Sequence, residues 1–124
     1  MEARTKLWIE ERGRLVMSDY RVRLLELIVD SGSLARAAQS LSLSYRRAWG
    51  KVRELEQNLG ISLIRSEAGG PGGGRSTLTP AGEALVSAYR QFHTRVERDT
   101  REAFEEILLP VLSASSRDVE RPSP

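Results

Sequence analysis

The chain has 124 residues, of which 40% are hydrophobic and 29% are charged, a composition typical of a folded domain. It contains no cysteine and one histidine, which excludes disulfide bonds, thiolate zinc sites, cysteine nucleophiles and multi-histidine metal sites. No apolar run approaches the roughly 20 residues that a membrane span requires. The charged N-terminus is unlike a signal peptide, so we expect a cytoplasmic protein with no membrane partner.

The net charge of +2 is unevenly distributed along the chain. Residues 1–32 hold six basic and six acidic residues, residues 33–79 hold seven and three, and residues 80–124 hold six and eight. These segments therefore contribute 0, +4 and −2 to the total of +2. Residues 31–53 contain five basic residues and no acidic one. Such a segment attracts a polyanion, because each base that meets a phosphate releases condensed counterions. A solvated helix face would carry the same charge, so both interpretations stay open here.

The N-terminal third predicts a small hairpin and a helix. Two short strands are expected at residues 6–11 and 14–17, around a tight turn that contains a glycine. A helix over about residues 19–31 follows, with Ser18 at the N-cap position and Gly32 at its end.

Two further capped helices, joined by a three-residue turn, are predicted next. Ser33 caps the first helix and Ser44 the second, and Gly60 ends the second. Apolar residues recur at helical spacing in both. In the first they are Leu34, Ala37, Ala38 and Leu41, and in the second Ala48, Val52, Leu55 and Leu59. This arrangement is a helix-turn-helix.

A strand at residues 61–65, a glycine-rich loop at 66–74 and a strand at 75–79 are predicted after the second helix. A strand, loop and strand in this place form a wing. The predicted fold is therefore mainly α, a winged helix-turn-helix with a short N-terminal β-hairpin and a long C-terminal dimerisation helix. Its DNA-binding domain is expected to span residues 1–79.

The long helix is expected over residues 80–112, and a polar tail at 113–124 is expected to be disordered. The apolar stripe of this helix needs a partner, and a second copy of the chain is the obvious one. The candidate dimerisation residues are Leu85, Tyr89, Phe92, Val96, Ala103 and Ile107.

The second helix of a helix-turn-helix enters the major groove, and its N-terminal residues meet base edges. Arg46 and Arg47 can each make two hydrogen bonds to guanine O6 and N7. Tyr45 and Trp49 could form a wall against a sugar or a thymine methyl group, but for Trp49 we favour packing inward against the first helix or the hairpin. Double-stranded DNA is thus the predicted partner. The candidate DNA-binding residues are Ser33, Arg36, Ser44, Tyr45, Arg46, Arg47 and Lys51, with Arg65, Arg75 and Thr77 in the wing. Arg65 could instead lie along a neighbouring helix.

Three segments carry a resemblance to a known family. The first is the run at residues 32–38, Gly-Ser-Leu-Ala-Arg-Ala-Ala, and the second is the run at 44–49, Ser-Tyr-Arg-Arg-Ala-Trp. The third is the glycine-rich wing at 69–74, with Leu-Thr-Pro-Ala-Gly at 78–82. Together they resemble the N-terminal domain of ModE-type molybdate-responsive regulators. LysR-type regulators share the broader pattern, which includes Leu-Glu-Gln-Asn-Leu-Gly at 55–60.

The resemblance implies a homodimeric winged helix domain that binds a pseudo-palindromic operator. It places DNA contacts at Ser33, Ser44, Tyr45, Arg46, Arg47 and Lys51, and it suggests control of molybdenum- or tungsten-related genes. Full-length sensors of the family add oxyanion-binding domains that this sequence does not contain. We therefore expect no molybdate or tungstate site within this chain, and no cofactor.

Two other function classes compete with DNA binding. Residues 69–76 nearly match a phosphate-binding P-loop, but a strand-like segment follows where that loop requires a helix. The acidic pairs at 10–11 and 105–106 and the lone His93 suggest solvated charge and a half-buried histidine, so we expect neither an enzyme nor a metal site. The remaining alternative is a winged-helix module that contacts another regulator protein.

Overall fold

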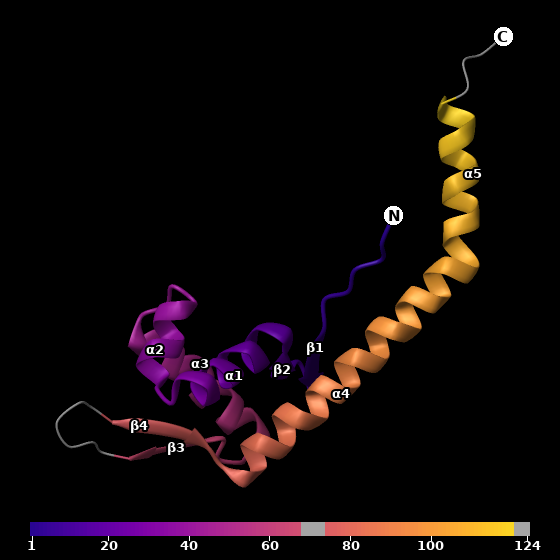
Figure 1. The fold of residues 1–124 in the computed structure, drawn as a ribbon. Helices are drawn as coiled ribbons and strands as arrows, with labels where there is room; N and C mark the ends of the chain where they lie inside the picture. The colour runs from indigo at the N-terminus through magenta and orange to yellow at the C-terminus, as the bar shows by residue number, and fades with distance from the viewer. Residues whose placement is uncertain (68–73, 121–124) are drawn as a thin grey trace. The chain divides into compact units, whose positions relative to one another are not determined.

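The computed structural model describes residues 1–67 and 74–120, with the side chains of 1–67 and 74–114. The chain forms two compact units. The larger unit is Leu7–Arg90, and the smaller unit combines Met1–Lys6 with Gln91–Pro124. Figure 1 shows that helices dominate both, with two short two-stranded sheets in the larger unit. Within the described ranges, no helix is both long and apolar enough to cross a membrane.

The larger unit begins with the expected hairpin, formed by strands β1 (Trp8–Glu11) and β2 (Arg14–Ser18). Arg12 and Gly13 connect the strands with φ angles of 52° and 77°. Positive φ at both central residues defines the type I′ turn, whose twist matches that of the flanking strands. The glycine adopts this conformation without steric cost, which explains why the turn forms here.

Three helices follow the hairpin, and their caps are the predicted ones. They are α1 (Asp19–Ser31), α2 (Leu34–Ser40) and α3 (Tyr45–Leu59). The hydroxyl oxygens of Ser18, Ser33 and Ser44 accept a backbone N–H three residues later at 3.1, 3.2 and 3.1 Å. Gly32 and Gly60 end α1 and α3 in the left-handed region, each with φ of 70°. Each cap satisfies a backbone group that the helix end would leave unpaired, so these boundaries follow from local sequence.

The three helices enclose one apolar core. Ala37 and Ala38 are almost completely buried, and their small side chains let α2 approach its neighbours closely. The largest fully buried side chains come from α1, α3 and the segment before the wing: Leu24, Leu25, Ile28, Leu55, Leu63, Val22 and Val52. Each large apolar side chain buried in this way contributes about 1.5–3 kcal/mol. Figure 1 shows α1, α2 and α3 grouped together, and strands β3 and β4 beside them.

Strands β3 (Ile64–Glu67) and β4 (Arg75–Leu78) pair antiparallel and form the wing. Together with the capped helices they confirm the predicted winged helix-turn-helix. Most of the predicted loop, at 68–73, lies outside the described residues.

The start of β3 differs from the sequence prediction, which placed a strand over 61–65. The backbone N–H groups of Leu63 and Ile64 donate to the Glu56 carboxylate at 2.8 and 3.3 Å. Pairing with β4 begins only at Ile64, opposite Leu78. The side chain of Glu56 on α3 thus takes the hydrogen bonds that a strand partner would otherwise supply.

Helix α4 (Pro80–Ala103) begins where the wing ends. The Thr79 hydroxyl accepts the N–H of Gly82 at 3.0 Å and donates to the Ser62 carbonyl at 2.6 Å. A Cβ atom on Gly82 would lie 2.5 Å from the backbone oxygen of Leu63. The Leu-Thr-Pro-Ala-Gly motif therefore has a structural role, since it caps α4 and brings it against the segment that precedes β3.

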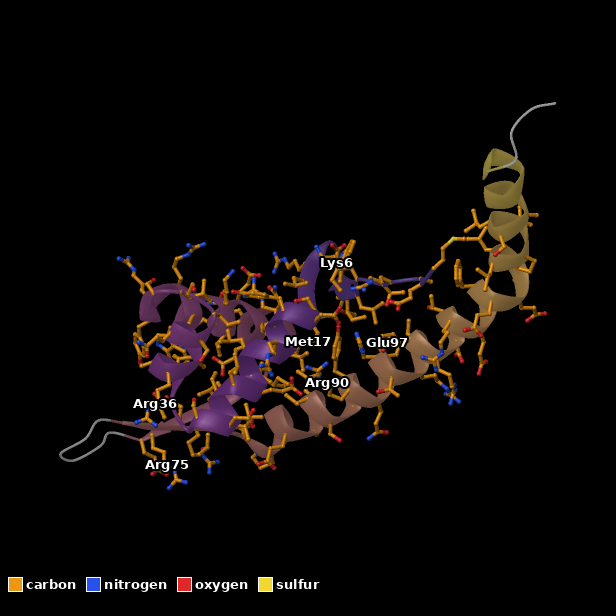
Figure 2. All side chains as sticks on the ribbon, turned by 45° about the horizontal axis from the view of Figure 1, so that its top comes forward. Lys6, Met17, Arg36, Arg75, Arg90 and Glu97 are labelled. Atoms are coloured by element: carbon orange, nitrogen blue, oxygen red, sulfur yellow. The ribbon has the colours of Figure 1, made fainter. Side chains whose placement is uncertain are left out.

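A polar network holds the first part of α4 against α1 and the hairpin. The Tyr89 hydroxyl contacts the Asp19 carboxylate and lies 3.4 Å from the carbonyl oxygen of Leu7. The guanidinium of the next residue, Arg90, forms a two-pronged ion pair with Glu26 on α1. Arg90 and the core-facing Met17 are labelled in Figure 2. These contacts tie the last residues of the larger unit to its core.

In the smaller unit the helix continues further than the sequence predicted. Helix α4 passes through a π-helical turn, η1 (Phe104–Leu108), into α5 (Leu109–Glu120). The N–H of Leu109 bonds the carbonyl of Phe104, five residues back. This wider turn stands just before Pro110, which lacks an N–H and clashes with the carbonyl four residues back in a regular α-helix.

The expected disordered tail at 113–124 is therefore wrong for residues 113–120, which are helical. Because the π-helical turn accommodates Pro110, the helix does not end there, and good helix formers such as Ala, Arg and Glu continue it. Residues 121–124 of that expected tail lie outside the described residues.

Candidate nucleic-acid interface

Helix α3 has one buried face and one exposed, basic face. Ala48 and Val52 are fully buried in the core, as the helical spacing predicted. Arg46, Arg47 and Gly50 lie on the exposed side of the same helix. The first turn of α3 therefore presents two guanidinium groups to solvent, and each has the planar fork that binds guanine or phosphate with two hydrogen bonds.

The N-terminus of α2 offers groups suited to phosphate. The Ser33 hydroxyl oxygen accepts the helix-capping N–H of Arg36, and its hydrogen remains able to donate to an anion. The Arg36 side chain is exposed. The backbone N–H of Ser76 in β4 donates to the Gly32 carbonyl at 3.0 Å, which joins the wing to the start of α2. Figure 2 shows Arg36 and Arg75 at this same end of the larger unit.

The wing strands place the three candidate wing residues on one face. Arg65 stands directly opposite Thr77 in the register, and Arg75 follows two positions from Thr77. All three are exposed, whereas the alternate residues Ile64 and Leu78 are buried. Successive side chains of a strand point to opposite faces, so Arg65, Arg75 and Thr77 share the outer face. Arg65 is exposed rather than covered by a neighbouring helix.

The two aromatic residues of α3 have different environments. Trp49 is half-buried against the core, which agrees with the inward packing expected for it. The Arg53 guanidinium lies 5.5 Å from the centre of its ring. Tyr45, one turn earlier, is 55% exposed beside the two arginines of the first turn. It is therefore the aromatic side chain of α3 that a bound molecule can reach.

The middle of α3 contacts α1 through charged and aromatic side chains that sequence reasoning did not connect. The Lys51 ammonium lies 5.4 Å from the centre of the Tyr20 ring. Arg21 is buried and its guanidinium lies 3.3 Å from the Glu54 carboxylate. Burial and the positive charges of Arg21 and Arg47 lower the pKa of Lys51 from its ordinary value. Tyr20 and Arg21 had no signal in the sequence, because only the packing of α1 on α3 brings them to Lys51.

The candidate dimerisation residues divide between the two units. Leu85 is half-buried against the core, and Tyr89 is 5% exposed within the larger unit. The apolar stripe predicted as one surface is thus not continuous: its first part packs inside the larger unit, and Tyr89 is unavailable to a second copy. In the smaller unit Phe92 and Ile107 are 44% and 69% exposed. Val96 is half-buried there, and Ala103 is exposed.

In the described part of the chain, no three histidine or acidic side chains lie close enough together to hold a metal ion. The His93 Nδ1 atom lies 2.9 Å from the Glu97 carboxylate, one turn later in α4. Glu105 and Glu106 are exposed on η1.

A known family matches about half of the chain. The profile of the family described as "Bacterial regulatory helix-turn-helix protein, lysR family" matches residues 20–83. This range contains α1 without its first residue, the helix-turn-helix, the wing and the start of α4.

Curated relatives match the N-terminal part of the chain. The "Molybdenum-pterin-binding protein MopB" of Rhodobacter capsulatus is 40% identical over 79 residues, which are 64% of this chain and 29% of that protein. The "DNA-binding transcriptional dual regulator ModE" of Escherichia coli K12 is 33% identical over 89 residues, 72% of this chain and 34% of that protein. The matched segment thus spans about a third of these relatives.

Solved structures share the fold. The CbnR_DBD–DNA complex superposes with a TM-score of 0.53 at 22% identity, over 85% of this chain and 100% of that chain. Full-length LysG of Corynebacterium glutamicum with bound effector Arg superposes with a TM-score of 0.52 at 26% identity, over 86% of this chain and 31% of that chain. Together with the family and its relatives, these matches confirm the resemblance that the motifs indicated.

Proposed function

This chain belongs to the lysR family of bacterial regulatory helix-turn-helix proteins, and we propose that it is a transcription regulator that binds double-stranded DNA with sequence specificity. The observation that carries this proposal is the exposed first turn of α3. Arg46 and Arg47 follow the Ser44 cap and stand opposite the buried Ala48 and Val52. In a helix-turn-helix this turn meets base edges in the major groove. Binding, not catalysis, is the work we assign to these residues.

The remaining basic groups of the larger unit support contacts to the sugar-phosphate backbone. Arg36 and the wing residues Arg65 and Arg75 are exposed, and the hydrogen bond from Ser76 to Gly32 joins their two elements. Phosphate contacts of this kind set the orientation of a protein on the duplex, while base contacts select the sequence. We assign Arg36 and the wing to the first role and Arg46 and Arg47 to the second.

We propose that the protein works as a homodimer on a pseudo-palindromic operator. Phe92 and Ile107 are large apolar side chains left exposed on the helices of the smaller unit, and a second copy would cover them. Two copies of α3 would then read half-sites about 34 Å apart, one turn of DNA. Because its ligand is the genome of a bacterium, we place the protein in the cytoplasm.

The names of the curated relatives suggest the regulated genes. MopB is named for molybdenum-pterin binding, and ModE is named as a transcriptional dual regulator. We propose control of molybdenum- or tungsten-related genes for this chain as well. Mapping its binding sites across the genome of its host tests this directly, since sites confined to unrelated promoters would contradict it.

A salt titration tests DNA binding itself. Fluorescence anisotropy with a labelled duplex should show an affinity that falls steeply as salt rises, because each phosphate contact contributes about −0.9 to the slope of log K against log salt. With several contacts, raising salt from about 50 to 200 mM should weaken binding by at least about tenfold. An affinity independent of salt, or no binding at low salt, would instead favour a winged helix that contacts another protein.

A further inference from the structure

Four side chains join the first turn of α1 to the middle of α3, and we call them the α1–α3 cluster: Tyr20, Arg21, Lys51 and Glu54. The Lys51 ammonium lies 5.4 Å from the centre of the Tyr20 ring, and the Arg21 guanidinium lies 3.3 Å from the Glu54 carboxylate. Tyr20 is 42% exposed, so a molecule bound along α3 can reach it. Neither residue of α1 is among the sequence-derived candidates for DNA contact.

The cluster contains more positive than negative charge. Arg21 and Lys51, with Arg47 close enough to affect Lys51, supply three positive charges, and the single carboxylate of Glu54 is half exposed to solvent. Arg21 is 9% exposed, and its Nη1 atom makes no hydrogen bond within the described residues. A buried guanidinium without full compensation is costly, and a bound anion lowers that cost. The electrostatics therefore favour an anionic ligand here.

The position of the cluster favours the backbone of DNA over its bases. Lys51 stands seven residues after the Ser44 cap, about two turns from the end of α3 that faces base edges. A compact ammonium and a phenol hydroxyl can each donate to a phosphate oxygen, and the phenol, with a single O–H donor, lacks the bidentate geometry that identifies a base. In a helix-turn-helix the helix before the recognition helix, here α2, crosses the phosphate backbone, and α1 packs against both α2 and α3.

We propose that Tyr20 and Lys51 together bind one phosphodiester group of the duplex that α3 reads, with Arg21 as the positioning residue whose positive charge attracts it. This inference rests on the proposed function and adds α1 to the DNA-binding surface. The Tyr20 ring holds the Lys51 ammonium by a cation–π contact, and its hydroxyl donates to the phosphate.

The experiment compares three variants of the full chain with wild type on two duplexes. One duplex is selected from a random pool for tight binding and the other has random sequence, and anisotropy is measured over a range of salt. Tyr20→Phe should weaken binding to both duplexes by about tenfold with an unchanged salt slope, because it removes one neutral donor to a charged acceptor. Lys51→Met should reduce the slope by about 0.9, since one phosphate contact is lost.

Arg23→Met is the matched control. Arg23 is an exposed base on the same helix, located near Glu26 and not in the cluster. Arg23→Met should keep the affinity for DNA within about twofold of wild type and leave the slope of log K against log salt unchanged, because exposed charges away from the contact are screened. Melting temperatures of the variants verify that each is folded before binding is compared.

The outcomes separate the inference from the function on which it rests. If wild type binds DNA and Tyr20→Phe binds it with the same affinity, the phosphate site is overturned and the proposed function stands. Loss of affinity only for the selected duplex also overturns it, since that result indicates a base contact. A slope reduced as much by Arg23→Met as by Lys51→Met overturns it too, because it indicates general electrostatics. Wild type that binds neither duplex overturns the proposed function and this inference together.

Discussion

Two exposed arginines of the helix-turn-helix should have separable effects on DNA binding. Arg46 lies on the first turn of α3, and Arg36 lies on the first turn of α2 beside its Ser33 cap. Arg46→Ala should cost about 1–3 kcal/mol on a duplex that presents the preferred base and should relax base preference there. Arg36→Ala should weaken all sequences alike.

Competition binding against single-base variants of a selected operator measures both effects. Equal weakening of every duplex by Arg46→Ala would assign that residue to the backbone and contradict a base contact. The wild-type profile over the same set of duplexes is the reference.

Tyr89 should make the stability of the protein depend on alkaline pH. Burial, followed by the hydrogen bond to Asp19, raises the pKa of Tyr89 above its ordinary value. Above about pH 10 the unfolded chain loses the phenol proton while the native state retains it, so the free energy of unfolding falls as pH rises. Tyr89→Phe should cost about 1.5–3 kcal/mol near neutral pH, and this difference from wild type should shrink above about pH 10.

Chemical denaturation at a series of pH values measures that difference. Tyr45→Phe is a matched control, because it makes the same chemical change at a tyrosine that is 55% exposed. It should follow wild type throughout. Parallel curves for wild type and Tyr89→Phe up to pH 12 would contradict the role given to the buried hydroxyl.

At the scale of helices and strands, two glycines in helices should respond oppositely to alanine. A Cβ on Gly82 would meet the backbone oxygen of Leu63 at 2.5 Å, and backbone cannot move aside cheaply. Gly82→Ala should therefore destabilise the fold by about 1–3 kcal/mol. A Cβ on Gly50 would meet nothing within 4 Å, so Gly50→Ala should stabilise α3 by about 1 kcal/mol.

Thermal unfolding separates the two variants, and DNA binding adds a second readout. If Gly50 admits close approach of α3 to the groove, the stabilised Gly50→Ala variant should bind DNA more weakly than wild type. A Gly82→Ala variant as stable as wild type would show that α4 can shift away from Leu63, against the close approach described above.

At the scale of the whole molecule, the exposed apolar side chains of the smaller unit should control assembly. Ile107→Glu places a charge where a second copy would bury an apolar side chain, and it should weaken dimerisation by about 2 kcal/mol or more. The preference for two half-sites one DNA turn apart should weaken with it. Thr94→Glu, which adds the same charge at an exposed polar position of α4, is the control.

Sedimentation equilibrium and binding to operators with altered half-site spacing measure these effects. An Ile107→Glu variant that remains dimeric would exclude this face as the interface. An unaltered preference for spacing in a monomeric variant would contradict the proposed two-fold arrangement on DNA.

The larger unit shows how far local signals reach. The serine caps at 18, 33 and 44 and the glycine ends at 32 and 60 stand where they were predicted, because each depends on hydrogen bonds and φ values within a few residues. The buried face of α3 was equally predictable, since a 3.6-residue period places Ala48 and Val52 on one side. The start of β3 and the end of the long helix were not predictable from local sequence. The first depends on the distant Glu56 carboxylate and the second on a π-helical turn before Pro110.

The candidate site divides in the same way. Periodicity and capping were enough to predict that Arg46 and Arg47 lie exposed on the first turn of α3, whereas the register of β3 and β4 was needed to place Arg65, Arg75 and Thr77 on one face. The tertiary structure alone revealed that Tyr89 belongs to a buried network and that Tyr20 stands beside Lys51. The physical reason is distance along the chain. Helix and turn propensities act between neighbouring residues, whereas burial and charge pairing depend on which remote segments pack together.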